Sequence, residues 1–363
     1  MSYRNSESRV AGIKRRNQLH ARKSWRRNIV HKRKLREKRR HKEKQSQEAK
    51  QHSDAYLRAD NAHSVTAPEI CSMLNNTEEF CQFIGNLHYF YINNLPVFVN
   101  MKKVVEIDDD AILVLLSIMI EFKQKYIKYN GNYPVNKTAK SKFENSKFFH
   151  YLNSKHIVDE HYLLNSADNQ IVTHANKDVN SDLATEVLDD ATKFLWGTPR
   201  YSKGAYRTII ELMQNTNNHA SLTNTGERHW WLSISKDSVT NSVSFAFIDY
   251  GIGIFQSLKH KKSTHWLKKQ YEMLISEFHN NCDILRRMLS GEMTNTSTGE
   301  IYRGKGIPGI KEVLDRKGIS SLHIITNDVY SDVGNDIYKK LQNKINGTFV
   351  YWELNKENIY HDK

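Results

Sequence analysis

Residues 211 to 220 read ELMQNTNNHA, which places a carboxylate, three amides and an imidazole close together. If this stretch is helical, Glu211, Asn215 and His219 recur every four residues and line one face. An amide oxygen is a hard ligand suited to Mg²⁺, and a nearby carboxylate can take a proton from water. On most helices such residues are only a solvated face, so the stretch alone favours that interpretation.

Two glycine-containing segments downstream have features that suit nucleotide binding. The segment SVSFAFIDYGIG, 242–253, predicts an apolar strand that ends in Asp249 and continues through Gly251 and Gly253. The carboxylate can accept a hydrogen bond, and glycines let a flat ligand approach the backbone. The segment RGKGIPG, 303–309, then leads into an amphipathic helix, and the amides at such a helix N-terminus can hold phosphate.

The spacing GKGIPG also fits the dinucleotide pattern G-x-G-x-x-G, which requires a hydrophobic strand directly before the glycines. The preceding residues, MTNTSTGEIYR at 293–303, are polar and typical of a turn, so a Rossmann site is disfavoured. The Walker A spacing is absent from the sequence as well.

In this order, ELMQNTNNHA, DYGIG, RGKGIPG and the GT at 347–348 resemble the four boxes of the GHKL ATP-binding fold. This is the Bergerat nucleotide site of gyrase, MutL-type repair proteins, the ninety-kilodalton heat-shock chaperones and histidine kinases. The resemblance covers about half the chain and implies ATP and Mg²⁺ as cofactors.

The resemblance also implies a role for each matching residue. Asn215 would bind Mg²⁺, Asp249 would accept a hydrogen bond from the adenine amino group, and Glu211 would be the catalytic base. The other implied nucleotide-binding residues are Asn218, His219, Gly251, Gly253, Gly304, Lys305, Gly306, Gly309 and Thr348. Asn218 stands where many histidine kinases have a lysine, so we expect a weaker phosphate contact there unless His219 replaces it.

The elements that must position these residues divide the chain into three parts, and the predicted fold class is α/β (α+β). Residues 1–60 form a basic arm, helical or disordered, 68–155 form a small α/β domain, and 165–358 form the ATP domain, a two-layer sandwich. Within the ATP domain the pattern predicts strands at 170–175, 242–249, 323–326 and 347–354 and helices at 181–197 and 203–220, with Ser181 as an N-cap. Residues 258–303 correspond to the ATP lid.

The predicted small domain contains a strand at 95–107, a buried helix at 109–129, a turn with a short strand at 130–136 and a helix at 140–152 whose phenylalanines pack in the core. This order resembles the STAS domain of anti-anti-sigma factors, in which a serine at the start of the helix is phosphorylated. Here that segment is Asp108–Asp110, which has no hydroxyl. We therefore expect a permanently acidic surface for a protein partner, or simply an acidic helix start.

The net charge of +14 belongs to the arm, because residues 1–50 hold 19 Lys and Arg against 4 Asp and Glu, whereas the remainder carries −1. Such an arm favours a nucleic-acid partner, with Trp25 placed to stack on an unpaired base; an acidic protein or a membrane surface is the alternative. The sequence has no membrane-spanning apolar run and no secretory signal, and its three cysteines lie far apart. These features favour a cytoplasmic protein with reduced thiols.

We therefore expect a GHKL ATPase that acts as a nucleotide-dependent conformational switch, with lid closure and a nucleotide-dependent homodimer. Two alternatives stay open: a protein serine kinase of the anti-sigma-factor type, and a nucleotide-sensing adaptor that does not hydrolyse ATP. A sensor histidine kinase is disfavoured, because no phosphoacceptor hairpin precedes the ATP domain.

Overall fold

The computed structural model describes residues 63–153, 170–176, 179–219, 229–260, 280–291 and 306–358. The chain divides into two compact units, Met1–Asn61 and Ala62–Lys363, and the first lies outside the described residues, as does the predicted arm 1–60. The second unit mixes helices and strands, so the expected α/β class is confirmed. Among the described helices, none combines the length and apolarity that a membrane crossing requires.

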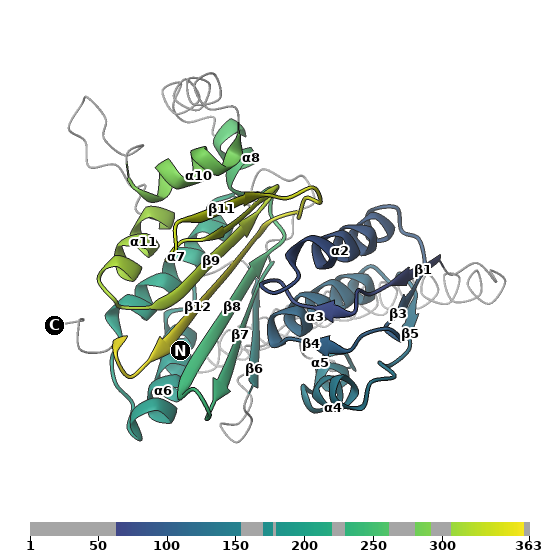
Figure 1. The fold of residues 1–363 in the computed structure, drawn as a ribbon, viewed down its shortest axis with the longest axis horizontal. Helices are drawn as coiled ribbons and strands as arrows, with labels where there is room; N and C mark the ends of the chain where they lie inside the picture. The colour runs from purple at the N-terminus through teal and green to yellow at the C-terminus, as the bar shows by residue number, and fades with distance from the viewer. Residues whose placement is uncertain are drawn as a thin grey trace, which may run out of the picture. The chain divides into compact units, whose positions relative to one another are not determined.

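Residues 63–153, here called the small module, contain a parallel three-stranded sheet in the order β1-β3-β5 (Figure 1). Its strands are β1 (His63–Thr66), β3 (Val97–Asn100) and β5 (Tyr129–Gly131), and a separate parallel pair consists of β2 (Ile70–Cys71) and β4 (Glu106–Ile107). Its helices are α2 (Thr77–Ile92), α3 (Asp109–Gln124), α4 (Lys137–Asn145) and α5 (Phe148–Asn153). The module therefore begins a few residues before the predicted boundary at 68, and α2 was not predicted.

The single strand predicted at 95–107 is wrong, because the chain forms β3 and β4 in two different sheets. A turn separates the two strands, closed by the Val104 N–H donating to the Met101 carbonyl at 3.0 Å. The exposed Lys102 and Lys103 lie in this turn, where their charges stay in water. The Val-rich run therefore contains a break between two strands, which the two adjacent lysines mark.

The predicted helices at 109–129 and 140–152 are also shorter than expected. Helix α3 ends at Gln124, because Tyr126 takes a left-handed φ of 57°, and α4 is separated from α5 by Lys147, with a φ of 58°. This break leaves Phe149 38% exposed, so the prediction of core packing is wrong for that residue, whereas Phe143 and Phe148 are buried.

Seven antiparallel strands form the large sheet, in the order β11-β10-β9-β12-β8-β7-β6. The strands are β6 (Gln170–Asn176), β7 (His229–Asp237), β8 (Ser242–Asp249), β9 (Ser320–Thr326), β10 (Val329–Asp332), β11 (Ile337–Lys340) and β12 (Thr348–Asn355). The four predicted strands at 170–175, 242–249, 323–326 and 347–354 are confirmed, and β7, β10 and β11 were not predicted.

The helices described alongside this sheet are α6 (Ser181–Trp196), α7 (Lys203–His219), α8 (Gly253–His260), α10 (Asn281–Leu289) and α11 (Gly306–Asp315). Helix α6 stops at Gly197, whose φ of 79° suits glycine, as predicted. Its N-cap is Asn180 rather than Ser181, because the Asn180 side chain accepts a hydrogen bond from the Leu183 N–H at 2.8 Å.

The middle strands of the large sheet are buried on both faces, which is unusual for an antiparallel sheet. Successive side chains alternate between faces, so Trp230 and Phe247 pack with the helices α6, α7 and α11, whereas Trp231 and Ile248 pack with the core of the small module. Figure 1 shows α7 and α11 on one side of the sheet and α2 and α3 on the other. The near-continuous apolar run of β8 follows from this double burial.

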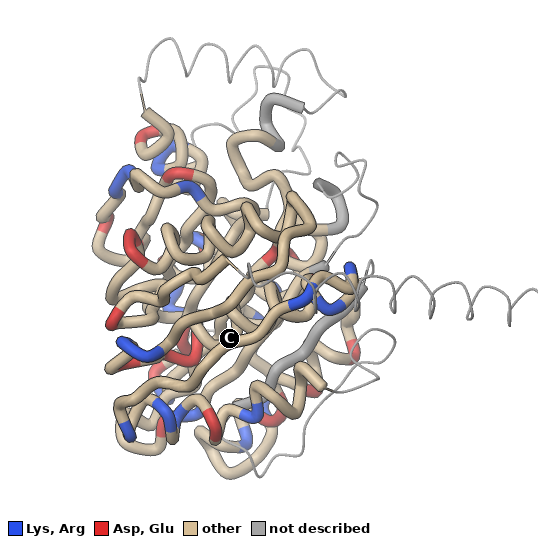
Figure 2. Tube along the Cα trace, turned by 90° about the vertical axis from the view of Figure 1, so that its right-hand side faces the viewer, with Lys and Arg blue, Asp and Glu red and all other residues tan. Residues whose placement is uncertain are grey.

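Helix α3 lies between the small sheet and the large one, and its buried apolar residues belong to the core that the small module shares with one face of the large sheet. Its residues are buried on nearly every side from Asp110 to Phe122, as expected of a helix that is apolar all round. In the described part of the chain, acidic and basic residues are interspersed over both the small module and the large sheet (Figure 2). The strongly basic composition is thus confined to residues that the structure does not describe.

Candidate functional site

Asp249 is the last residue of β8, and the neighbouring strands bring Trp230 and Thr348 alongside it. Its side chain is half-buried, and the Gly251 N–H donates to its Oδ1 at 2.8 Å. Burial raises the pKa of this carboxyl to about 6, although the backbone N–H groups of Gly251 and Thr348 favour the ionised form. The carboxylate is therefore held in place by the chain itself, ready to accept a further hydrogen bond.

The glycines around Asp249 are required by the protein's own packing. An added Cβ on Gly347 would lie 1.8 Å from the Asp249 carbonyl oxygen, and one on Gly253 would lie 2.5 Å from the Asn327 side chain. Gly347 and Gly253 also take left-handed φ values of 99° and 74°. A Cβ on Gly251 would lie 2.9 Å from Asp249 Oδ1. The sequence analysis explained these glycines by the close approach of a ligand, and that explanation is therefore incomplete.

The tip between β9 and β10 fixes the turn that follows Asp249. The Asn327 amide donates to the Ile252 carbonyl at 3.0 Å and accepts from the Phe255 N–H at 3.3 Å. Thr326 Oγ1 accepts from the Ile254 N–H at 3.1 Å and lies 3.2 Å from the buried Thr348 hydroxyl. These contacts join the turn from Gly251 to Phe255 to β12, the strand that begins with Thr348.

A second group forms where α7 packs against α11. An added Cβ on Gly306, the first residue of α11, would lie 2.8 Å from Asn215 Oδ1, so the two residues are in direct contact. Within the described residues, the buried Asn215 Nδ2 has no hydrogen-bond partner. An unpaired buried amide is costly, which makes this side chain a candidate ligand-binding group.

Glu211 lies one turn before Asn215 and is 21% exposed. The Arg207 guanidinium lies 3.9 Å from Glu211 Oε1 and 3.1 Å from Glu312 Oε2 on α11. A Cβ on Gly309 would lie 2.7 Å from Arg207 Nη2, so glycine leaves room for this bridge. The predicted base is thus engaged by a cation in this structure.

The remaining predicted site residues fall wholly or partly outside the described residues. Gly304 and Lys305 are not described, and neither is most of the predicted lid, 258–303, apart from the start of that range and α10. Asn218 and His219 belong to the last turn of α7, but their side chains are not described.

The described residues suit Mg²⁺ only through Asn215. Among them, no cluster of three or more His, Cys, Asp or Glu could hold a metal ion. Mg²⁺ commonly takes one or two protein ligands and completes its shell with phosphate and water, so a single amide next to a helix N-terminus fits that chemistry.

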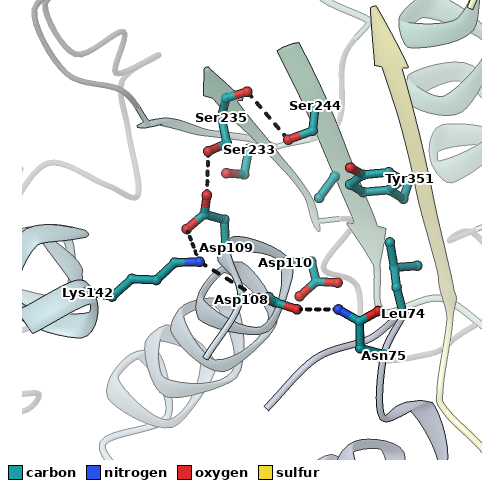
Figure 3. Close-up of a pocket in the computed structure, with 11 residues that line it drawn as sticks. Leu74, Asn75, Asp108, Asp109, Asp110, Lys142, Ser233, Ser235, Ser244 and Tyr351 are labelled. Carbon is teal, nitrogen blue, oxygen red and sulfur yellow. Dashed lines mark hydrogen bonds and ion pairs between the residues drawn. The ribbon is translucent and has the colours of Figure 1, made fainter. Parts of the chain in front are cut away.

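A cavity of about 260 Å³ lies elsewhere, between the N-terminus of α3 and the face of the large sheet that is turned toward the small module (Figure 3). Asp109 accepts a hydrogen bond from Ser235 of β7, and Lys142 lies 3.5 Å from Asp109 and 3.8 Å from Asp108. Asp110 is buried and accepts from the Met73 N–H at 3.2 Å.

The expected acidic surface for a protein partner stays a prediction, but Asp110 does not belong to it, because its side chain is buried. Burial, and then the charge of Asp108, raises the pKa of Asp110 to about 7, so that carboxyl is not permanently charged. The Asp108–Asp110 segment faces the chain's own sheet, and its Asp109 side chain is already bonded there.

Sequence reasoning missed three residues that contact the predicted site. Arg207 precedes Glu211 by four residues, a helical spacing that could have identified it. The other two make contacts with residues far away in the sequence: Asn327 with Ile252, and Tyr250 with Ser117 on α3. No periodicity or spacing in the sequence indicates those two contacts.

Comparison with models of known protein families and with curated proteins found no match to this chain.

Proposed function

We propose that the chain binds ATP with Mg²⁺ and acts as a GHKL-type ATPase, a nucleotide-dependent conformational switch. One observation carries this proposal: residues from four motifs that are far apart in the sequence lie next to one another in two pairs. Asp249 lies directly opposite Thr348 in the sheet, and Asn215 contacts Gly306. The first pair suits a base, and the second suits Mg²⁺ and phosphates at the start of a helix.

The adenine end of the proposed site depends on the hydrogen-bond acceptor at Asp249. The Gly251 N–H donates to Oδ1 and so fixes the orientation of this carboxylate. The second oxygen can then accept a hydrogen bond from a ligand. The Thr348 hydroxyl is buried against Thr326, which suits an indirect role in recognising the base.

The phosphate end supplies charge compensation and, in an ATPase, a base. When bound, Mg²⁺ would neutralise phosphate charge beside the Asn215 amide. Glu211 lies on the same face of α7, where its carboxylate would take a proton from the attacking water. Gly304 and Lys305 would close on the phosphates, as the resemblance implies.

A non-hydrolysing nucleotide sensor is the second candidate, and the engagement of Glu211 by Arg207 favours it. The Arg207 guanidinium lies beside the Glu211 carboxylate, where an attacking water would have to bind, so turnover requires that the pair separates. We therefore expect hydrolysis to be slow.

The test is a comparison of Glu211→Ala with the wild type in ATP binding and in phosphate release. We expect the variant to bind ATP with an unchanged Kd and to lose at least about 100-fold in turnover, because general bases typically contribute that much. Normal phosphate release by Glu211→Ala would contradict the base assignment. ATP binding without turnover in the wild type would favour the sensor, and label transferred from ATP to protein would favour the kinase.

A further inference from the structure

Tyr250 stands between Asp249 and Gly251, and its side chain leaves the proposed nucleotide site for the small module. The Tyr250 hydroxyl lies 2.7 Å from Ser117 Oγ and 3.2 Å from the Val114 carbonyl oxygen, both in the middle of α3. Ser117 is fully buried, and its own hydroxyl lies 2.8 Å from the same Val114 oxygen. Three polar groups from two parts of the chain thus satisfy one another in an apolar core.

The Tyr250 backbone has little freedom to move independently of this contact. Gly347 directly precedes β12, and a Cβ added to it would lie 2.9 Å from the Tyr250 Cα. The start of β12 therefore closes one side of the turn. The Asn327 side chain holds the next residues on the other side. A shift of the Asp249–Gly251 turn therefore has to move the Tyr250 ring against α3.

Among the described residues, α3 is hydrogen-bonded near its N-terminus and in its middle to elements outside the small module. Its N-terminus is bonded through Asp109 to Ser235 of β7 (Figure 3), and its middle is bonded through Ser117 to Tyr250, which follows β8. The bond to Tyr250 adjoins the proposed adenine acceptor. A buried hydroxyl pair of this kind is costly to break, because each partner then lacks a hydrogen bond in a low-dielectric surrounding.

We propose that Tyr250 is a positioning residue that couples nucleotide binding at Asp249 to helix α3 of the small module. This proposal rests on the proposed function, because it assigns a regulator to the same site. Since coupling between two sites is reciprocal, any partner that displaces α3 changes nucleotide affinity by the factor by which nucleotide changes that partner's affinity. The small module is thereby the sensing or output surface of the switch.

The test uses the full-length protein with Tyr250→Phe, Ser117→Ala and the double variant, each titrated with ATP and with ADP. Tyr250→Phe keeps the ring and removes both hydroxyl contacts, so we expect about 3- to 10-fold weaker binding of both nucleotides. Ser117→Ala leaves the Val114 oxygen for Tyr250, so its effect is smaller. The double variant should match Tyr250→Phe alone, because both changes remove the same contact.

Tyr91→Phe is the matched control, since the Tyr91 hydroxyl donates to Glu121 at 2.7 Å, a hydrogen bond that joins α3 to α2 rather than to the Asp249 turn. It should lower thermal stability without weakening nucleotide binding. Hydrogen exchange supplies a second readout: ATP should protect the α3 amides around Ser117 in the wild type and not in Tyr250→Phe.

Wild-type binding with unchanged affinity in Tyr250→Phe would overturn this coupling while leaving the proposed function intact. Equal weakening by Tyr91→Phe would also overturn it, because any loosening of α3 would then suffice. A wild type that binds neither nucleotide would overturn the proposed function and this coupling together.

Discussion

At the scale of single residues, Asp249 is the residue proposed to recognise the adenine base. Its carboxylate accepts a hydrogen bond from the Gly251 N–H at Oδ1. An asparagine at this position has one acceptor oxygen, which that N–H group requires, so its NH₂ would face the adenine amino group, donor against donor. The isosteric change thus keeps the shape of the site and removes the complementarity.

The raised pKa of Asp249 predicts a pH dependence of nucleotide choice. With a pKa of about 6, the carboxyl is ionised above that pH and protonated below it. We expect ATP affinity to fall by up to roughly tenfold per pH unit below 6, because a protonated carboxyl no longer matches the amino donor. Inosine triphosphate, which presents a carbonyl oxygen there, should not weaken in the same way.

The measurement is the ratio of the two affinities between pH 5 and 8, in which titration of the phosphates cancels. Asp110→Asn is the control, because the pKa of Asp110 is about 7 but it lies in the cavity beside α3. The control should keep the pH dependence, and a ratio independent of pH in the wild type would contradict the role of Asp249. In the absence of ligand the sign is opposite: a raised acid pKa makes the folded state gain stability as pH falls from about 6 toward 3.8, the ordinary pKa of an aspartate.

At the scale of elements, the β9–β10 tip supports the nucleotide turn. Asn327→Ala removes two hydrogen bonds to the 252–255 backbone and empties the space beside Gly253. We expect a loss of about 1–3 kcal/mol in the free energy of unfolding and weaker ATP binding. Thermal unfolding and ATP titration measure the two effects.

Asn335→Ala is the matched control for this prediction. Its amide donates to Asp332 at 2.8 Å near the end of β10, and it has no contact with the nucleotide turn. The control should bind ATP as the wild type does. If Asn327→Ala also binds ATP with wild-type affinity, the tip does not support the site.

The elements also show what sequence patterns can and cannot provide. The strand β8 and the helices α6 and α7 were predictable, because apolar periodicity and glycine stops act over a few residues. The strands β10 and β11 were missed, since VYSD and IYKK are short and mostly polar. The pairing of Asp249 with Thr348 was expected only through the resemblance, because strand register across about 100 residues leaves no local signal.

At the scale of the whole molecule, the burial of both sheet faces was not predictable. The apolar run of β8 fits a strand covered on both faces, but nothing in it identifies α3 as the cover. The same applies to Tyr250, whose partner Ser117 lies 133 residues away. The sequence predicted the parts of the site, whereas its attachment to the small module emerged only from the fold.

The basic arm gives a prediction for the whole chain. Deleting residues 1–50 removes 19 Lys and Arg, and we expect loss of nucleic-acid binding with unchanged ATP binding. The affinity of the full chain for a labelled single-stranded RNA should fall steeply with salt, as counterion release requires, when followed by fluorescence anisotropy. Unchanged RNA affinity after the deletion would exclude the arm as the binding segment.

Calorimetric titration with ATP and Mg²⁺ measures directly whether this chain holds a nucleotide at Asp249 and Asn215. The wild type should show one saturable site per chain, and Asp249→Asn should show no saturation while unfolding at nearly the same temperature. Saturable binding of equal affinity by a folded Asp249→Asn, or no binding by the wild type, would contradict the account.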